Sequence, residues 1–160
     1  MPGAWRPGQR LGFDILTRPV VRLAKPIPAH ADARGRPQPE RRAGAETDAF
    51  LAHVLRGGAA DDPPDAVATR EAVYLRWLAD RLAPAARLEE GRMTGFQHRR
   101  AARTSVSEGP EATLQGTLEI ADPEQFVELL TRGVGRHRAY GYGMLLLRAP
   151  GRPAPESLAC

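Results

Sequence analysis

The sequence has 160 residues, with 23 Lys and Arg against 19 Asp and Glu, a formal net charge of +4 and a pI of about 10.0. This length suits one domain with a substantial hydrophobic core and excludes two large domains. The modest positive charge permits a polyanionic partner without requiring one. Every basic residue except Lys25 is an arginine. The planar guanidinium of arginine can bond two phosphate oxygens at once.

Several classes of protein are excluded by what the sequence lacks. Cys160 is the only cysteine, which excludes an internal disulfide framework and a cysteine-based zinc site. The first ten residues lack the apolar stretch of a signal peptide, and no stretch approaches the roughly 20 apolar residues of a membrane span. The sequence therefore predicts a cytoplasmic protein with no membrane segment, and it contains no motif that indicates a cofactor.

The first half of the chain contains one clear strand and then a long polar insertion. Alternating apolar residues indicate a strand over residues 11–18. Residues 24–68 are rich in Pro, Gly, Ala and charge, and predict a loop-rich insertion. Within this insertion, residues 47–55 have the apolar spacing of a short helix, and residues 57–66 are expected to be mobile.

The second half begins with a helix and two extended segments. Thr69 begins a helix with apolar residues at helical spacing, and Pro84 ends it. Residues 86–106 are expected to be extended and carry many arginines. Residues 114–120 alternate between apolar and polar, as in a half-buried strand.

The last helix is marked at both ends. Asp122 is a typical N-cap followed by proline, Gln125 lies three residues later, and Gly133 is typical of the position just after a helix. An apolar strand over residues 144–147 follows. The Pro-rich tail over residues 150–160 is expected to be disordered.

These elements follow the order strand, helix, strand, strand, helix, strand. This is the split βαβ order of the ferredoxin-like fold, so the sequence predicts an α+β domain with an insertion after its first strand. The two middle strands, around residues 87–98 and 113–120, would form a hairpin with arginines at its tip.

A glycine loop, GVGRHRAYGYG at residues 133–143, joins the last helix to the last strand. Its glycines allow close approach of the backbone to a phosphate, and its arginines can neutralise phosphates. Tyr140 and Tyr142 can stack on bases or pack beneath the loop. The composition leaves two alternatives open, namely RNA binding and a flexible connection with a solvated basic surface.

A cluster of arginines lies at residues 92–103, on or beside the predicted hairpin. A basic hairpin has a shape that can enter the groove of an RNA stem-loop, where it contacts phosphates more than base edges. A solvated hairpin tip is the alternative.

The histidines include two candidates for a general acid or base. His98 and His137 lie in basic segments, and imidazole titrates near neutral pH. A structural role or an RNA contact is the alternative for both. The four histidines form no HxxxH pair and no carboxylate cluster accompanies them, so no metal site is predicted.

Three stretches of the sequence resemble the C-terminal part of CasE proteins, the guide-RNA endoribonucleases of type I-E CRISPR systems. They are WRPGQRLGFDILTRPVVR at 5–22, REAVYLRWLADRL with AARLEE at 70–90, and LQGTLEIADPEQFVELLTRGVGRHRAYGYGMLLLRAP at 114–150. The last stretch is the most specific, because it combines the Asp-Pro helix start, the glycine loop and an apolar final strand.

The resemblance implies two tandem ferredoxin-like (RAMP) domains that cut CRISPR repeat RNA beside a stem-loop without a metal. The protein would then stay on the hairpin within the Cascade complex, with no cofactor. Two sets of RNA-binding residues are implied. The stem set is Arg99, Arg100 and Arg103. The loop set is Gly133, Gly135, Arg136, His137, Arg138, Tyr140, Gly141 and Gly143.

The resemblance also implies a domain division. Residues 1–9 correspond to a linker remnant, 10–149 to the C-terminal RAMP domain with its insertion at 24–68, and 150–160 to the tail. The family's first RAMP domain, which carries the catalytic histidine, would precede the matched region, and no position here matches that histidine. Whether the chain is an enzyme is therefore left open, and a separate N-terminal RAMP half is an expected partner.

Three hypotheses follow from the sequence. The chain is the RNA-binding half of a guide-RNA-processing endoribonuclease, a non-catalytic RNA-binding subunit, or a structural ferredoxin-like module that binds a protein.

Overall fold

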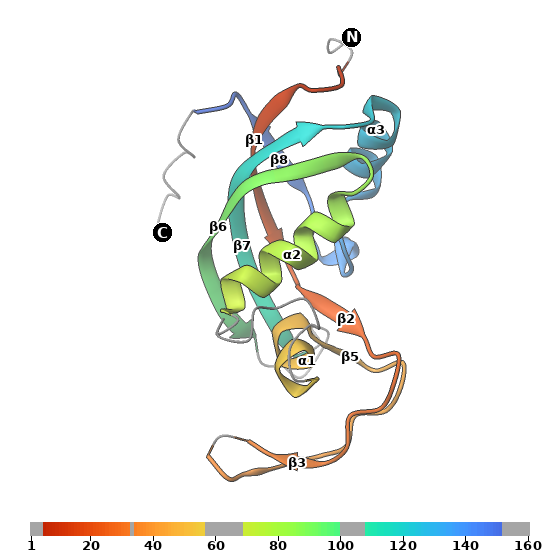
Figure 1. The fold of residues 1–160 in the computed structure, drawn as a ribbon, viewed down its shortest axis with the longest axis vertical. Coiled ribbons are helices and arrows are strands. Elements are labelled where there is room, and N and C mark those ends of the chain that lie inside the picture. Colours follow the sequence, from red (N-terminus) through yellow and green to blue (C-terminus); the bar gives the residue numbers. More distant parts are fainter. Residues whose placement is uncertain (1–4, 33, 57–68, 100–107, 152–160) are drawn as a thin grey trace.

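The computed structural model describes residues 5–32, 34–56, 69–99 and 108–151. Its centre is one four-stranded antiparallel sheet in the order β6-β7-β1-β8. The strands of this sheet are β1 (Arg10–Thr17), β6 (Ala86–Arg99), β7 (Gly109–Ile120) and β8 (Leu145–Arg148). The helices between them are α2 (Arg70–Leu82) and α3 (Pro123–Arg132). This order and topology confirm the predicted ferredoxin-like fold (Figure 1).

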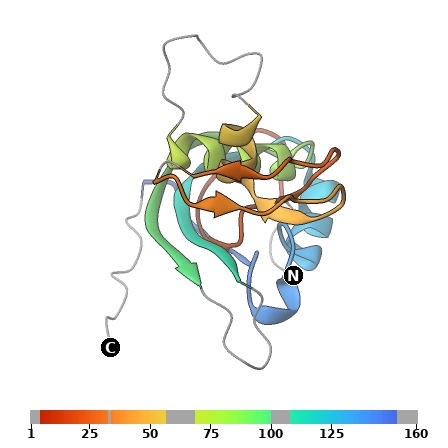
Figure 2. The ribbon, with the colours of Figure 1, turned by 90° about the horizontal axis from the view of Figure 1, so that it is seen from below.

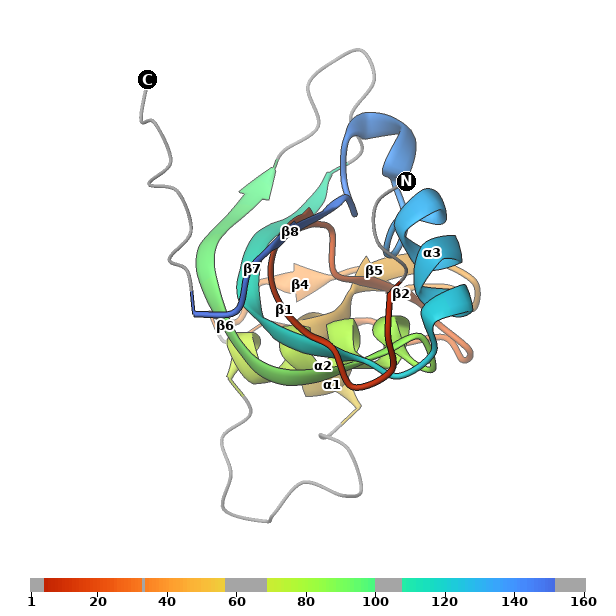
Figure 3. The same ribbon diagram turned by 90° about the horizontal axis from the view of Figure 1, so that it is seen from above.

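Both helices cover the same face of the sheet (Figure 3). Their buried side chains join those of the strands in one hydrophobic core, in which Phe13 of β1 and Phe126 of α3 are fully buried. Alternate residues of β1 and β7 point into this core, because successive side chains of a strand face opposite sides of the sheet. Burial of alternate side chains therefore explains the apolar alternation that predicted these strands.

The helix boundaries follow local signals. Thr69 caps α2 by accepting a hydrogen bond from the Ala72 amide at 3.1 Å. Asp122 caps α3 by accepting from the amides of Glu124 and Gln125 at 3.0 and 3.1 Å. These bonds satisfy amides that have no partner inside the helix. Both predicted starts are thus confirmed.

The insertion is more regular than predicted. β2 (Val20–Arg22) pairs with β5 (Glu46–Asp48), and β3 (His30–Ala31) pairs with β4 (Pro37–Gln38). A bridge between Ile27 and Arg41 links the two pairs into one long ribbon, which projects beyond the sheet in Figure 1 and is seen from below in Figure 2. We define residues 20–48 as the insertion ribbon.

Within the insertion predicted at 24–68, the sequence did not predict the short strands β3, β4 and β5. Its paired segments have two or three residues, too few for an alternating pattern to appear in a sequence rich in Pro and charge. The predicted short helix is confirmed as α1 (Ala49–Leu55), which begins after Asp48. The segment expected to be mobile, 57–66, and the tail beyond residue 151 lie outside the described residues.

Among the described helices, none is long and apolar enough to cross a lipid bilayer.

Candidate nucleic-acid interface

The glycine loop, residues 133–143, is held by backbone bonds at both ends. The Val134 amide donates to the Gly143 carbonyl at 2.8 Å, and the Gly143 amide donates to the Leu16 carbonyl at 2.8 Å. Gly133, Gly135, Gly141 and Gly143 all have positive φ, which glycine adopts without the steric cost of a Cβ. The loop is therefore a compact structure fixed to the end of β1, and its glycines are required by its backbone.

Two of the loop's three basic residues contact a carboxylate of the insertion ribbon. His137 Nε2 lies 2.5 Å from Glu46 Oε1, and Arg136 Nη1 lies 3.8 Å from Glu46 Oε2. His137 itself has a positive φ of 63°. Arg138 instead donates from Nη1 to the Arg132 carbonyl at 2.6 Å, near the end of α3. Glu46 was missed in the sequence analysis, since it lies 91 positions from His137 and no local pattern marks it.

The two tyrosines of the loop, for which the sequence left base stacking and packing open, differ in their exposure. Tyr140 is 61% exposed, so its ring is free to stack on a base. Tyr142 is only 5% exposed and packs beneath the loop. Its hydroxyl donates to Glu111 Oε2 of β7 at 2.5 Å. One tyrosine therefore faces solvent while the other fixes the loop to the hairpin.

Glu111 is the centre of a polar cluster between the glycine loop and the β6–β7 hairpin. Besides Tyr142, its carboxylate accepts from the Gln97 side chain and lies 3.3 Å from Arg99 Nη1. Burial opposes the charged form of Glu111, but hydrogen bonds from Tyr142 and Gln97 and the charges of Arg99 and Arg18 outweigh it. The pKa of Glu111 is therefore lowered. We call these five residues the Glu111 cluster.

Arg18 forms the buried side of this cluster. It is 2% exposed, donates from Nε to the Pro110 carbonyl at 3.4 Å, and lies with its guanidinium carbon 5.7 Å from the centre of the Tyr142 ring. The ionised Glu111 beside it offsets part of the cost of burying this charge. The cluster thus joins the ends of β1, β6 and β7 to the glycine loop.

The predicted RNA-binding arginines are only partly described. Arg99 is the last described residue of β6, and its side chain is 53% exposed while it contacts Glu111 and Tyr142. It therefore brings the two predicted RNA-binding segments, the hairpin and the glycine loop, side by side. Arg100 and Arg103 lie outside the described residues.

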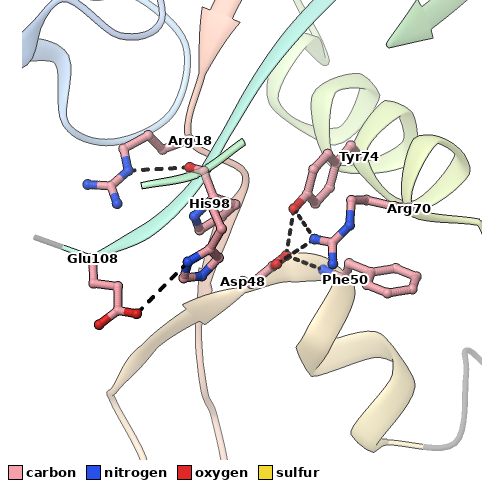
Figure 4. Close-up of polar contacts among 8 residues, drawn as sticks. Arg18, Asp48, Phe50, Arg70, Tyr74, His98 and Glu108 are labelled. Carbon is pink, nitrogen blue, oxygen red and sulfur yellow. Dashed lines mark hydrogen bonds and ion pairs between the residues drawn. The ribbon is translucent and has the colours of Figure 1, made fainter. Parts of the chain in front are cut away.

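His98 has a charged partner outside the Glu111 cluster. Its Nδ1 lies 3.9 Å from Glu108 Oε1, and its side chain is half exposed (Figure 4). The structure does not bring His98 and His137 into contact with each other, since their charged partners are Glu108 and Glu46. In the described ranges, no three His, Cys, Asp or Glu side chains are grouped so that they could hold a metal ion.

A second buried polar group ties the insertion ribbon to α2, and sequence analysis missed it. Asp48 accepts from Arg70 Nη1 at 2.6 Å and from the Tyr74 hydroxyl at 2.9 Å, while it also caps α1 (Figure 4). Burial and the Asp48 carboxylate raise the pKa of Tyr74, so its hydroxyl stays protonated as a donor. Arg70 lies between the rings of Phe50 and Phe96, at 4.4 and 4.3 Å from their centres.

The resulting surface can bind a polyanion. Arg99, Arg136, Arg138 and Tyr140 are all exposed, and they belong to two segments that the Glu111 cluster holds together. Arginines with an adjacent exposed aromatic ring are the combination that RNA-binding surfaces use for phosphates and bases.

Solved structures with the same fold include two that contain bound RNA. A Thermus thermophilus Cse3 bound to an RNA representing a pre-cleavage complex is 24% identical, with a TM-score of 0.57 over 92% of this chain and 57% of the other. A CRISPR endoribonuclease Cse3 bound to 19-nucleotide RNA is 25% identical, with a TM-score of 0.56 over 91% and 58%. Cas6e from Escherichia coli K-12 is 18% identical, with a TM-score of 0.58 over 93% and 65%.

The chain thus spans 57% to 65% of the length of these solved chains. No curated protein sequence matches it significantly. The family whose sequence profile does match is described as CRISPR associated protein, and the match covers residues 1–149. The predicted resemblance to CasE proteins is confirmed, and the chain belongs to the CRISPR associated protein family.

Proposed function

We propose that this chain binds the stem-loop of CRISPR repeat RNA, as part of the machinery that processes guide RNA and then holds it in a surveillance complex. One observation carries the proposal. The Glu111 cluster joins the basic hairpin end at Arg99 to the glycine loop that carries Arg136, Arg138 and Tyr140. A surface built from two rigidly joined basic segments suits the two backbones of an RNA stem.

The likeness to Cse3 structures solved with RNA supports this proposal, as does the family to which the chain belongs. A CRISPR RNA-guided surveillance complex is also among the similar structures, at 17% identity and a TM-score of 0.50. We further propose that residues 10–149 act as a RAMP domain beside a second RAMP unit, with residues 1–9 as a linker. Within this proposal His98 and His137 remain candidates for a role in cleavage.

The first test is an electrophoretic mobility shift of a CRISPR repeat hairpin across salt concentrations. The double variant Arg136→Ala/Arg138→Ala should bind about 10- to 30-fold more weakly, with a shallower dependence of affinity on salt, because two phosphate contacts are lost. Arg87→Ala is the matched control, since Arg87 is an exposed arginine at the opposite end of β6. Binding that is absent, or insensitive to salt, would rule out the RNA-binding function.

A second variant should increase the affinity for the RNA hairpin. Glu46→Gln removes the negative charge beside Arg136 and His137 while it keeps the shape of the side chain. Because a fixed carboxylate repels phosphates and competes for these cations, the variant should bind the hairpin about three-fold more tightly at low salt. The measurement is the same mobility shift. A weaker or unchanged affinity would show that the glycine-loop cations do not face the RNA.

A cleavage assay in EDTA tests whether the chain also cuts the hairpin without a metal. Activity that His137→Ala abolishes and His98→Ala retains would assign the role to the glycine loop. Activity that only His98→Ala abolishes would assign it to the hairpin end. If the chain binds the hairpin but leaves it uncut, the chain alone does not cleave RNA, and adding a second RAMP unit then separates a half-enzyme from a non-catalytic RNA-binding subunit.

A further inference from the structure

A cavity of about 450 Å³ lies between the insertion ribbon and the described ends of the β6–β7 hairpin. The ribbon and α1 supply Arg41, Thr47 and Phe50 to its wall, and the hairpin supplies His98 and Glu108. Figure 4 shows Phe50 on one side of this region and the His98–Glu108 pair on the other. The cavity is separate from the Glu111 cluster, and its volume lies in the range of small-molecule sites.

Two buried polar atoms in its wall have no hydrogen-bond partner among the residues that the structure describes. They are Thr47 Oγ1 and Arg41 Nε, and Thr47 as a whole is 2% exposed. A buried polar atom without a partner costs about 1–3 kcal/mol, so such atoms are rare and call for an explanation. Rotation about χ1 would turn the Thr47 hydroxyl among three staggered positions. Thr47 Oγ1 is closed to solvent in its present rotamer, so a ligand in the cavity would reach this hydroxyl only after such a rotation.

The charges around the cavity argue against a phosphate as that ligand. Three carboxylates line it, from Glu46, Asp48 and Glu108, against two guanidinium groups, from Arg41 and Arg70. Arg70 is already bonded to Asp48. A dianionic phosphate would therefore enter a site with no excess of positive charge, at a high desolvation cost.

A neutral heterocyclic base fits these walls better. Carboxylates accept hydrogen bonds from the ring and amino N–H groups of bases, while arginine donates to ring nitrogens and carbonyl oxygens. Phe50 and the apolar side chains of Leu51 and Pro110 offer surfaces for its flat faces. His98, which lines the cavity, lies at the end of the hairpin proposed to enter the RNA stem.

We propose that this cavity takes one unpaired nucleobase of the RNA that the hairpin holds. The inference rests on the proposed RNA-binding function and adds a site that selects for a base rather than for the phosphate backbone. Such a site would favour a stem that carries an unpaired nucleotide at a fixed position over a continuous duplex. An unpaired base can turn out of the stack at small cost, whereas a paired base cannot.

The test measures the affinity of the full chain for repeat hairpins in which each unpaired nucleotide in turn is made abasic. We expect one position at which loss of the base weakens binding about 10-fold. In Thr47→Val, which keeps the size of the side chain and removes the hydroxyl, the same abasic change should have little further effect. Thr47→Ser should restore the sensitivity. Thr131→Val on α3, where the exposed hydroxyl donates to the Val127 carbonyl of its own helix, is the control.

The outcomes separate the two proposals. If the unsubstituted chain binds no hairpin, the proposed function fails and this inference fails with it. If the hairpin is bound but every abasic RNA binds equally well, the nucleobase site alone is overturned. An abasic effect that is as large in a folded Thr47→Val as in the unsubstituted chain would place the base elsewhere, for instance on Tyr140. If Thr47→Val does not fold, the abasic scan of the unsubstituted chain decides.

Discussion

Gly143→Ala is expected to destabilise the protein by about 3–4 kcal/mol and to abolish binding of the RNA hairpin. Gly143 has φ 83°, and a Cβ at this position would lie 2.1 Å from the backbone oxygen of Val134. That oxygen belongs to the loop itself, so relief of the clash would require the backbone to move. The movement would break the bonds of the Gly143 amide and carbonyl to Leu16 and Val134.

The matched control is Gly141→Ala in the same loop. Gly141 has nearly the same φ, 86°, but an added Cβ would meet no heavy atom of the described residues within 4 Å. Gly141→Ala should lower the free energy of unfolding by only about 1–2 kcal/mol, the cost of a positive φ for an alanine. Urea denaturation of both variants measures the difference, and the mobility shift measures binding. Equal losses in the two variants would show that the close contact at Val134 does not hold the loop.

Most of the fold could be predicted from the sequence because the relevant signals are local. The Asp-Pro start of α3, the Thr69 cap of α2 and the apolar alternation of β1 each depend on residues within a few positions. Their order then specifies the ferredoxin-like topology. The insertion ribbon could not be predicted in the same way, because its strands are short and are held by pairing between residues 6 to 28 positions apart.

In the candidate site, too, the residues marked by a local sequence signal could be predicted, and those brought together from distant positions could not. Tyr140, Arg136 and Arg138 could be found because they are concentrated in one glycine-rich segment. Glu46 and Glu111 could not, since each is an isolated acidic residue whose partners come from distant parts of the chain. Opposite charges that meet only through the tertiary structure leave no periodic or spacing signal in a single sequence.

Glu111→Gln is expected to show that the Glu111 cluster holds the hairpin and the glycine loop together. The change removes one charge and little volume, yet it leaves the cations of Arg18 and Arg99 without the carboxylate that they stabilise. Arg99 is half exposed, so solvent will offset most of the cost of leaving its charge without the carboxylate. Arg18 is buried, and the loss of a buried counter-charge dominates the expected cost of about 2–4 kcal/mol in the free energy of unfolding.

The pH dependence of stability provides a second measurement of the same effect. The pKa of Glu111 is lowered in the folded state, so its carboxylate stabilises the fold fully above the ordinary value of 4.5. This contribution is lost as the pH falls from that value through the folded pKa. The free energy of unfolding should therefore fall less steeply with acidification below pH 4.5 in Glu111→Gln than in the unsubstituted protein.

Glu119→Gln is the control for this change, because Glu119 lies on the same strand and forms a partly exposed ion pair with Arg87 at 3.7 Å. It should alter stability by less than about 1 kcal/mol and leave RNA affinity unchanged. In Glu111→Gln, by contrast, the hairpin end and the glycine loop lose their shared anion and should move independently. RNA affinity should then fall even under conditions in which the variant is fully folded. A folded Glu111→Gln with normal affinity would mean that the two basic segments do not need to be held together to bind RNA.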